Sequence, residues 1–141
     1  MPMTIHVDIV SATEEIFSGL AKMVLAPAEM GEVGIMPRHA PLLTRLKPGE
    51  IRVRVPGGTE ESFYVSGGML EVQPHVVTVL ADVALRARDI DEAQALQAKR
   101  RAEEELRHKS SDFEYARAQI QLAKSLAQLR TVERLRRSRR A

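Results

Sequence analysis

The residue types that most often carry chemistry are sparse and scattered in this chain. Its four histidines, His6, His39, His75 and His108, each fall in a different segment. None has the His-x-x-x-His or two-histidine-one-carboxylate spacing that a metal site or an acid–base site needs. Cysteine is absent, which excludes disulfides, thiolate nucleophiles and cysteine metal ligands. We therefore expect the histidines to be structural or surface residues.

A short serine and glycine motif in the middle of the chain has little catalytic character. Ser66 precedes Gly67 and Gly68, but it lies in no Gly-x-Ser-x-Gly nucleophile elbow. The two glycines lack the lysine and the helix start of a phosphate-binding loop. A tight turn between two strands is the better interpretation, and nothing in the sequence favours an enzyme.

The strongest electrostatic feature is a cluster of arginines near the C-terminus. Its members are Arg130, Arg134, Arg136, Arg137, Arg139 and Arg140. They could contact nucleic acid or an anionic membrane, although no aromatic residue lies among them to stack on bases. They could also be the solvated end of a helix, or bind an acidic protein surface.

A second candidate is the segment 31–48, where Pro37, Pro41 and Pro48 fix backbone dihedrals and Gly34 permits a tight bend. We expect it to hold Glu32 and His39 on stiff loops. A stiff polar loop can be a docking epitope, because it loses little entropy on binding. From the residues alone it could equally be a structural turn.

These residues must be positioned by two different architectures. In residues 5–9 and 51–55 apolar and polar side chains alternate, which is the period of a half-buried strand. Turn residues at 56–59 and 67–68 separate further short apolar runs. This pattern predicts an antiparallel β-sandwich over residues 1–86.

The pattern changes near Asp89, and no glycine or proline occurs from there to residue 140. Asp89 with Glu92, and Ser111 with Glu114, have the spacing of helix-capping boxes. The polar residues 107–110 separate them. We therefore predict an antiparallel two-helix hairpin over residues 87–141, and the fold class is mainly β plus α.

The apolar face of this hairpin is rich in alanine. In the first helix the expected positions are Ala95, Ala98, Ala102 and Leu106. In the second they are Tyr115, Ala118, Leu122, Leu126, Leu129 and Val132, with Ala116, Ile120, Ala123 and Ala127 beside them. Alanine buries little area, so the hairpin should be held together weakly and could move.

Charge separates the two parts further. Residues 1–88 contain eight Lys or Arg and ten Asp or Glu, a net charge of −2, whereas residues 89–141 contain thirteen and nine, a net charge of +4.

The N-terminal residues do not have the pattern of a signal peptide, and no apolar run is long enough to cross a bilayer. We expect any membrane association to be indirect, through a partner.

Several ordered segments resemble one known family. They are Gly34–Thr44, Leu46–Gly49, Ser66–Val72, Val77–Asp82, Ala98–Arg100 and Tyr115–Ala116. Together they are similar to the epsilon subunit of bacterial F-type ATP synthases, over nearly the whole chain. The resemblance implies a non-catalytic rotor subunit of the central stalk, which couples proton flow through the c-ring to ATP synthesis. It also implies a location on the cytoplasmic face of the inner membrane, with membrane contact only through the complex.

The resemblance also implies roles for the two candidate regions. Glu32, Arg38 and His39 would dock the sandwich on the gamma subunit and the c-ring. The hairpin would fold back in one state and extend along gamma in another, where it inhibits ATP hydrolysis. A further set of residues would then contact the acidic beta subunits of the catalytic alpha/beta head: Arg130, Arg134, Arg136 and Arg137.

Some members of that family bind ATP through an Ile/Leu-Asp-x-x-Arg motif in the hairpin. Here Asp91 is present, but Gln94 stands where the arginine belongs. Arg101 matches a second basic position, and Lys124 and Gln128 fall where strong binders have arginines. Because glutamine offers a phosphate neither charge nor a bidentate fork, we expect no cofactor and ATP as a weak regulatory ligand at most. The competing hypothesis is a nucleic-acid-binding module that uses the C-terminal arginines.

Overall fold

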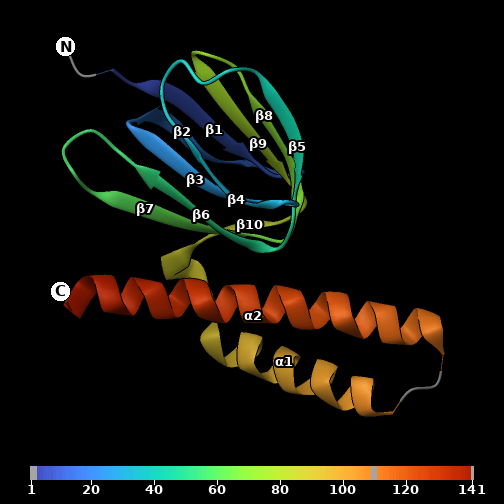
Figure 1. Cartoon of the computed structure of the whole chain (residues 1–141). Coiled ribbons are helices and arrows are strands. Elements are labelled where there is room, and N and C mark those ends of the chain that lie inside the picture. Colours follow the sequence, from blue (N-terminus) through green and yellow to red (C-terminus); the bar gives the residue numbers. More distant parts are fainter. Residues whose placement is uncertain (1–2, 109–110, 141) are drawn as a thin grey trace. The chain divides into compact units, whose positions relative to one another are not determined.

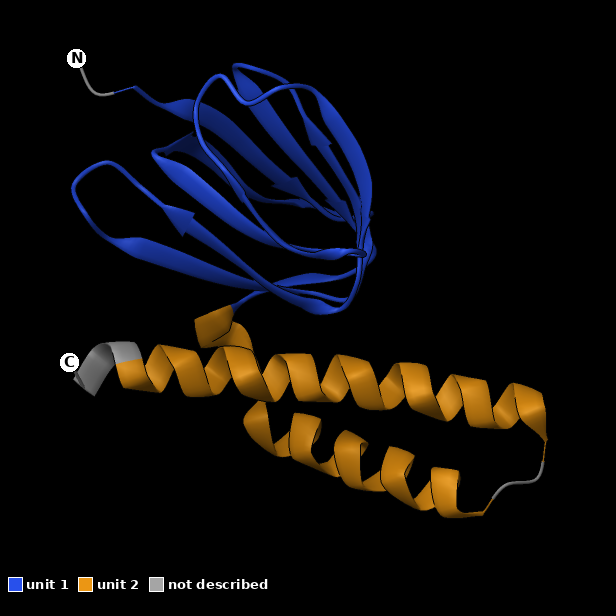
Figure 2. Cartoon of the chain, viewed as in Figure 1, with its two compact units in different colours: residues 1–86 blue, residues 87–141 orange. Residues whose placement is uncertain are grey.

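The computed structural model describes residues 3–108 and 111–140, with the side chains of residues 138–140 left undescribed. The chain separates into two compact units, residues 1–86 and residues 87–141, which are coloured separately in Figure 2.

The first unit is built from strands (Figure 1). In chain order they are β1 (Ile5–Val10), β2 (Glu15–Ala21), β3 (Met23–Ala28), β4 (Gly31–Ile35), β5 (Leu42–Leu46), β6 (Gly49–Arg54), β7 (Glu60–Val65), β8 (Gly68–Val72), β9 (Val76–Ala81) and β10 (Ala84–Arg86).

The strands form one sheet that folds over on itself. Its order is β10-β7-β6-β3-β5-β8-β9-β1-β2, and β4 pairs with β3 outside this path. Among the described strands every pair is antiparallel except β1 with β9, which run parallel. The predicted β-sandwich is confirmed, with this parallel pair as a departure from its antiparallel pattern. β1 and β9 lie far apart in sequence, so no tight turn forces them to be antiparallel.

Alternation along the strands places the core. Ile5, Val7 and Ile9 of β1 are fully buried, as the period-two pattern predicts. Ile51 and Val53 of β6 are buried in the same way. The remaining large members of the core cluster are Val24, Ile35, Leu46, Phe63, Val65, Leu70, Val72, Val77 and Val79.

The second unit contains a short 3-10 helix η1 (Ala87–Asp89) and two helices, α1 (Glu92–Arg107) and α2 (Asp112–Arg140). The helices lie side by side and run antiparallel (Figure 1). The predicted helical hairpin is therefore confirmed.

The helix caps agree with the sequence at one end and correct it at the other. Ser111 Oγ accepts a hydrogen bond from the Glu114 amide at 3.1 Å, as the predicted cap requires. The prediction of Asp89 as the first cap was wrong, because Asp89 lies in η1. Asp91 caps α1 instead, with its carboxylate accepting from the Gln94 amide at 3.1 Å.

On the facing sides of α1 and α2 the fully buried side chains are mostly small, and the predicted Leu122, Leu126 and Leu129 are half-buried. Ala95 and Ala102 are the buried residues of α1. In α2, Ala118, Ser125 and Val132 recur every seven residues on one stripe and are buried. The predicted Ala98 and Leu106 are only half-buried, and Ile120 is 56% exposed.

Two further properties concern the described residues only. None of their helices combines the length and the apolar character that crossing a bilayer requires. Their His, Asp and Glu side chains form no cluster of three or more that could hold a metal ion.

Candidate functional site

Glu32 lies on a strand, not on a loop. β3 and β4 form a hairpin in which Glu32 is opposite Pro27, and Gly31 has the positive φ of 136° that ends the turn. The expectation of a loop at Glu32 was therefore wrong. The glycine that suggested a loop ends a tight turn, and pairing with β3 continues directly after it.

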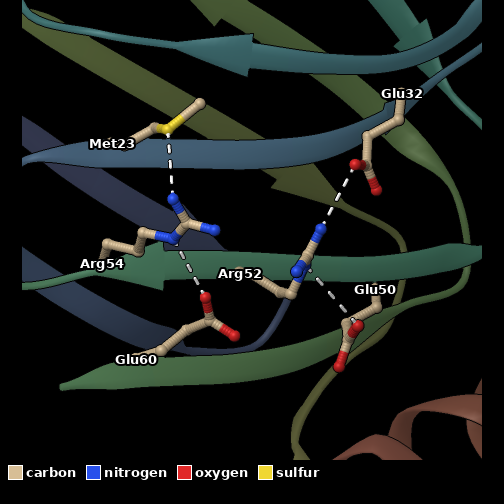
Figure 3. A network of polar contacts seen from close by, with 6 residues as sticks. All are labelled: Met23, Glu32, Glu50, Arg52, Arg54 and Glu60. Atoms are coloured by element: carbon tan, nitrogen blue, oxygen red, sulfur yellow. Dashed lines mark hydrogen bonds and ion pairs between the residues drawn. The ribbon is translucent and has the colours of Figure 1, made fainter.

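The Glu32 carboxylate belongs to a polar network on the outer side of the sheet (Figure 3). Arg52 of β6 lies between two carboxylates: its Nη2 is 3.2 Å from Glu32 Oε1, and its Nε is 3.9 Å from Glu50 Oε1. Arg54, on the same strand, pairs with Glu60 at 3.2 Å.

The burial of Arg52 distinguishes it from an ordinary surface arginine. Its side chain is only 15% exposed, whereas the Glu32 side chain is 54% exposed. Arg52 thus restrains a carboxylate that remains accessible to a partner, which reduces the entropy that Glu32 loses on binding. The alternation of apolar and polar residues predicts only that Arg52 lies on the outer face of a strand. It does not predict that Arg52 pairs with Glu32.

Arg38 and His39 lie in the connection between β4 and β5. Arg38 has a φ of 67°, which a residue other than glycine rarely adopts, and its amide donates to the Pro74 carbonyl at 2.9 Å. The His39 amide donates to the Met36 carbonyl at 3.1 Å, and His39 Nδ1 lies 2.6 Å from the Ala40 carbonyl oxygen. These contacts hold the connection in one conformation, with the Arg38 side chain exposed.

The three predicted docking residues do not form one compact site. Glu32 is near the start of β4, and Arg38 and His39 follow its end. Because a strand rises about 3.3 Å per residue, Glu32 and Ile35, the last residue of β4, are roughly 10 Å apart along the strand. A partner that binds all three residues must therefore extend along β4.

The C-terminal arginines differ in their surroundings. The guanidinium of Arg136 contacts the carboxylate of Glu92 at the start of α1. Arg137 pairs with Glu133 of its own helix at 2.6 Å. Arg130 and Arg134 are exposed. The side chains of Arg139 and Arg140 lie outside the described residues.

The structure does not gather the predicted nucleotide-binding residues. The Asp91 carboxylate caps α1 and is engaged with the backbone. Arg101 lines a cavity of about 830 Å³ between the helices, and neither Asp91 nor Lys124 lines it. The other lining residues are Ala98, Ala102, Glu104, Glu105, His108, Glu114, Arg117 and Gln121.

Two family models match the chain, one after the other. The first is described as the β-sandwich domain of the ATP synthase delta/epsilon chain and matches residues 4–87. The second is described as the long α-helix domain of the same chain and matches residues 88–133.

Curated relatives agree along nearly the full length. The ATP synthase epsilon chain of Nitrosococcus oceani is 67% identical over 136 residues, which cover 96% of this chain and 97% of the relative. That of Thioalkalivibrio sulfidiphilus is 62% identical over 138 residues, covering 97% and 98%.

A solved structure has the same fold at low sequence identity. A chain of the Euglena gracilis mitochondrial ATP synthase structure, described as OSCP/F1/c-ring, matches with a TM-score of 0.81 and 21% identity. The match covers 90% of this chain and 80% of that one. The fold agrees with the two family models, which match the chain one after the other, and with the two relatives above 60% identity. This chain therefore belongs to the ATP synthase delta/epsilon chain family.

Proposed function

We propose that this chain is the epsilon subunit of the central stalk of a bacterial F-type ATP synthase. The observation that carries the proposal is the full-length similarity to bacterial proteins named ATP synthase epsilon chain. In this role the chain is a non-catalytic rotor subunit that couples proton flow through the c-ring to ATP synthesis. It works on the cytoplasmic face of the inner membrane, and only the complex brings it to the bilayer.

In this proposal the sandwich is the docking part. Glu32 presents an exposed charge near the start of β4, and Arg38 presents another in the restrained connection after β4, followed by the half-buried His39. These residues would contact the gamma subunit and the c-ring. Charge complementarity at such a rim sets orientation and association rate more than the total affinity.

The hairpin is the regulatory part. The fully buried side chains between its two helices are mostly small and bury little area, which suits a hairpin whose helices must separate and rejoin. When it extends along gamma, Arg130, Arg134, Arg136 and Arg137 would contact acidic surfaces of the beta subunits and inhibit ATP hydrolysis. ATP itself would be a weak ligand of the hairpin at most.

A reconstitution tests the proposal. The full chain is added to a bacterial alpha–beta–gamma complex that has been freed of its epsilon subunit, and binding is followed by co-elution. We expect stoichiometric binding, which Glu32→Lys together with Arg38→Glu should weaken. Failure of the unmodified chain to bind would contradict the proposal. A salt-dependent shift of DNA or RNA mobility, lost with the C-terminal arginines, would instead support the nucleic-acid hypothesis.

A further inference from the structure

One ion pair joins the two helices of the hairpin at the end opposite their covalent connection. Glu92 is the first residue of α1, and Arg136 lies in the last turns of α2, 44 positions later. Their side chains are in contact and are 42% and 57% exposed. Of the other ion pairs described within these helices, Lys99 with Glu103 lies in α1 and Arg137 with Glu133 lies in α2.

The position of Arg136 also shows which stripe of α2 faces α1. Arg136 falls on the same stripe as Ala118, Ser125 and Val132, because eighteen residues make five full turns of helix. Since Arg136 reaches Glu92 of α1, that whole stripe forms the seam. Ala118, Ser125 and Val132 bury little apolar area, and Leu122 and Leu129 beside them are only half-buried, so the seam contributes less to closure than fully buried leucines would.

The buried hydroxyl of the seam does not hold the helices together either. Ser125 Oγ donates to the Gln121 carbonyl of its own helix at 3.0 Å. Separating the helices therefore leaves this hydroxyl with its hydrogen bond intact. Opening the seam therefore breaks no interhelical hydrogen bond at Ser125.

We propose that the Glu92–Arg136 ion pair is a latch that keeps the hairpin closed. The covalent connection holds the helices at one end, and the latch holds them at the other. Charges at these two positions also suit the helix dipoles, with an acid at the start of α1 and a base near the end of α2. The inference goes beyond the proposed function, because it concerns the isolated chain and needs no partner.

An exposed ion pair contributes little to the free energy of unfolding of a rigid protein. The same small contribution is enough to change the populations of two states that are close in free energy. Exposed pairs shift an equilibrium by about two- to fivefold at moderate salt. A hairpin whose closed and separated states are close in free energy would show that shift directly in its populations. Salt screens such a pair, so the separated population should also rise with ionic strength.

The experiment is a distance measurement on the full chain. Because the protein has no cysteine, Gln97→Cys and Gln128→Cys introduce the two positions for spin labels, one on each helix. Glu92→Gln and Arg136→Gln should each raise the separated fraction about two- to fivefold. Arg137→Gln is the matched control: it removes the same charge one position along, but its partner lies in the same helix.

Two more variants separate the latch from other effects. Glu92→Asp keeps the negative charge at the helix start but shortens the side chain, so it should behave like Glu92→Gln. The double variant Glu92→Gln with Arg136→Gln should separate no further than either single variant, since each already breaks the pair. Distances that are the same in Arg136→Gln and Arg137→Gln, or effects that add in the double variant, would overturn the proposal.

Discussion

Arg86 Nη2 donates a hydrogen bond to the carbonyl oxygen of Ile16 at 2.8 Å, and so links the two strands that end the sheet order. Arg86 belongs to β10 and Ile16 to β2, which are 70 positions apart. The same guanidinium lies 5.4 Å from the ring centroid of Phe63 and 3.4 Å from Glu61. One side chain thus connects the first and last edges of the sandwich over a core phenylalanine.

This link predicts a stability loss on Arg86→Met, which keeps an unbranched apolar stem and removes the donors. We expect unfolding to become easier by about 1–3 kcal/mol, because a charged donor and its contact with an aromatic ring are both lost. Urea titration followed by the NMR signals of the buried valines checks it. Arg45→Met, at an exposed arginine of β5, is the control. Equal losses in the two variants would show that the link is unimportant.

A second prediction concerns Gly68 at the start of β8. Its φ is +146°, and a Cβ atom there would overlap the carbonyl oxygen of Leu80. Gly68→Ala should therefore destabilise the sandwich by about 3 kcal/mol or more. Gly58→Ala is a matched comparison: its φ is +93° and a Cβ atom would meet nothing within 4 Å.

Gly58→Ala should lower the free energy of unfolding by only about 1–2 kcal/mol, which is the cost of placing a residue with a Cβ atom at positive φ. The same urea titration measures both variants. A Gly68→Ala protein as stable as the Gly58→Ala protein would mean that the strand can shift to make room.

The sequence predicted those parts of the fold that depend on local pattern. The alternation in residues 5–9 is enough to bury Ile5, Val7 and Ile9, because a strand turns every second side chain to the same face. Ser111 was identified as a cap, because its hydroxyl and the Glu114 amide are only three residues apart.

The errors arose where the decisive contact is distant or where local signals compete. Asp89 and Asp91 both suit a cap, and only the 3-10 turn at Ala87–Asp89 decides between them. The ion pairs of Glu32 with Arg52 and of Glu92 with Arg136 join residues 20 and 44 positions apart. The periodicity of apolar residues along the chain contains no information on such distant pairs.

A third prediction concerns nucleotide binding. Calorimetric titration of the full chain with ATP should show no binding with a Kd in the micromolar range or tighter. Gln94 offers a phosphate no charge, the Asp91 carboxylate caps α1, and neither Asp91 nor Lys124 lines the cavity at Arg101. Gln94→Arg is the informative comparison. A micromolar Kd for the unmodified chain would contradict this account of the hairpin.

A fourth prediction connects the latch to regulation. If closure withholds the hairpin from the catalytic head, Glu92→Gln should inhibit ATP hydrolysis at about two- to fivefold lower concentration than the unmodified chain. Glu92 rather than Arg136 is changed here, because Arg136 belongs to the proposed contact with the beta subunits. Glu104→Gln, at another exposed glutamate of α1, should leave the inhibition unchanged.

The most direct test of the central claim compares the full chain with a version that ends after Arg88. Both are added to the same alpha–beta–gamma complex, and the rate of ATP hydrolysis is measured at saturating amounts of each. We predict that both bind gamma, because the sandwich is a compact unit of its own, and that only the full chain inhibits. Equal inhibition by the truncated chain would contradict the account, since the hairpin would then have no part in regulation.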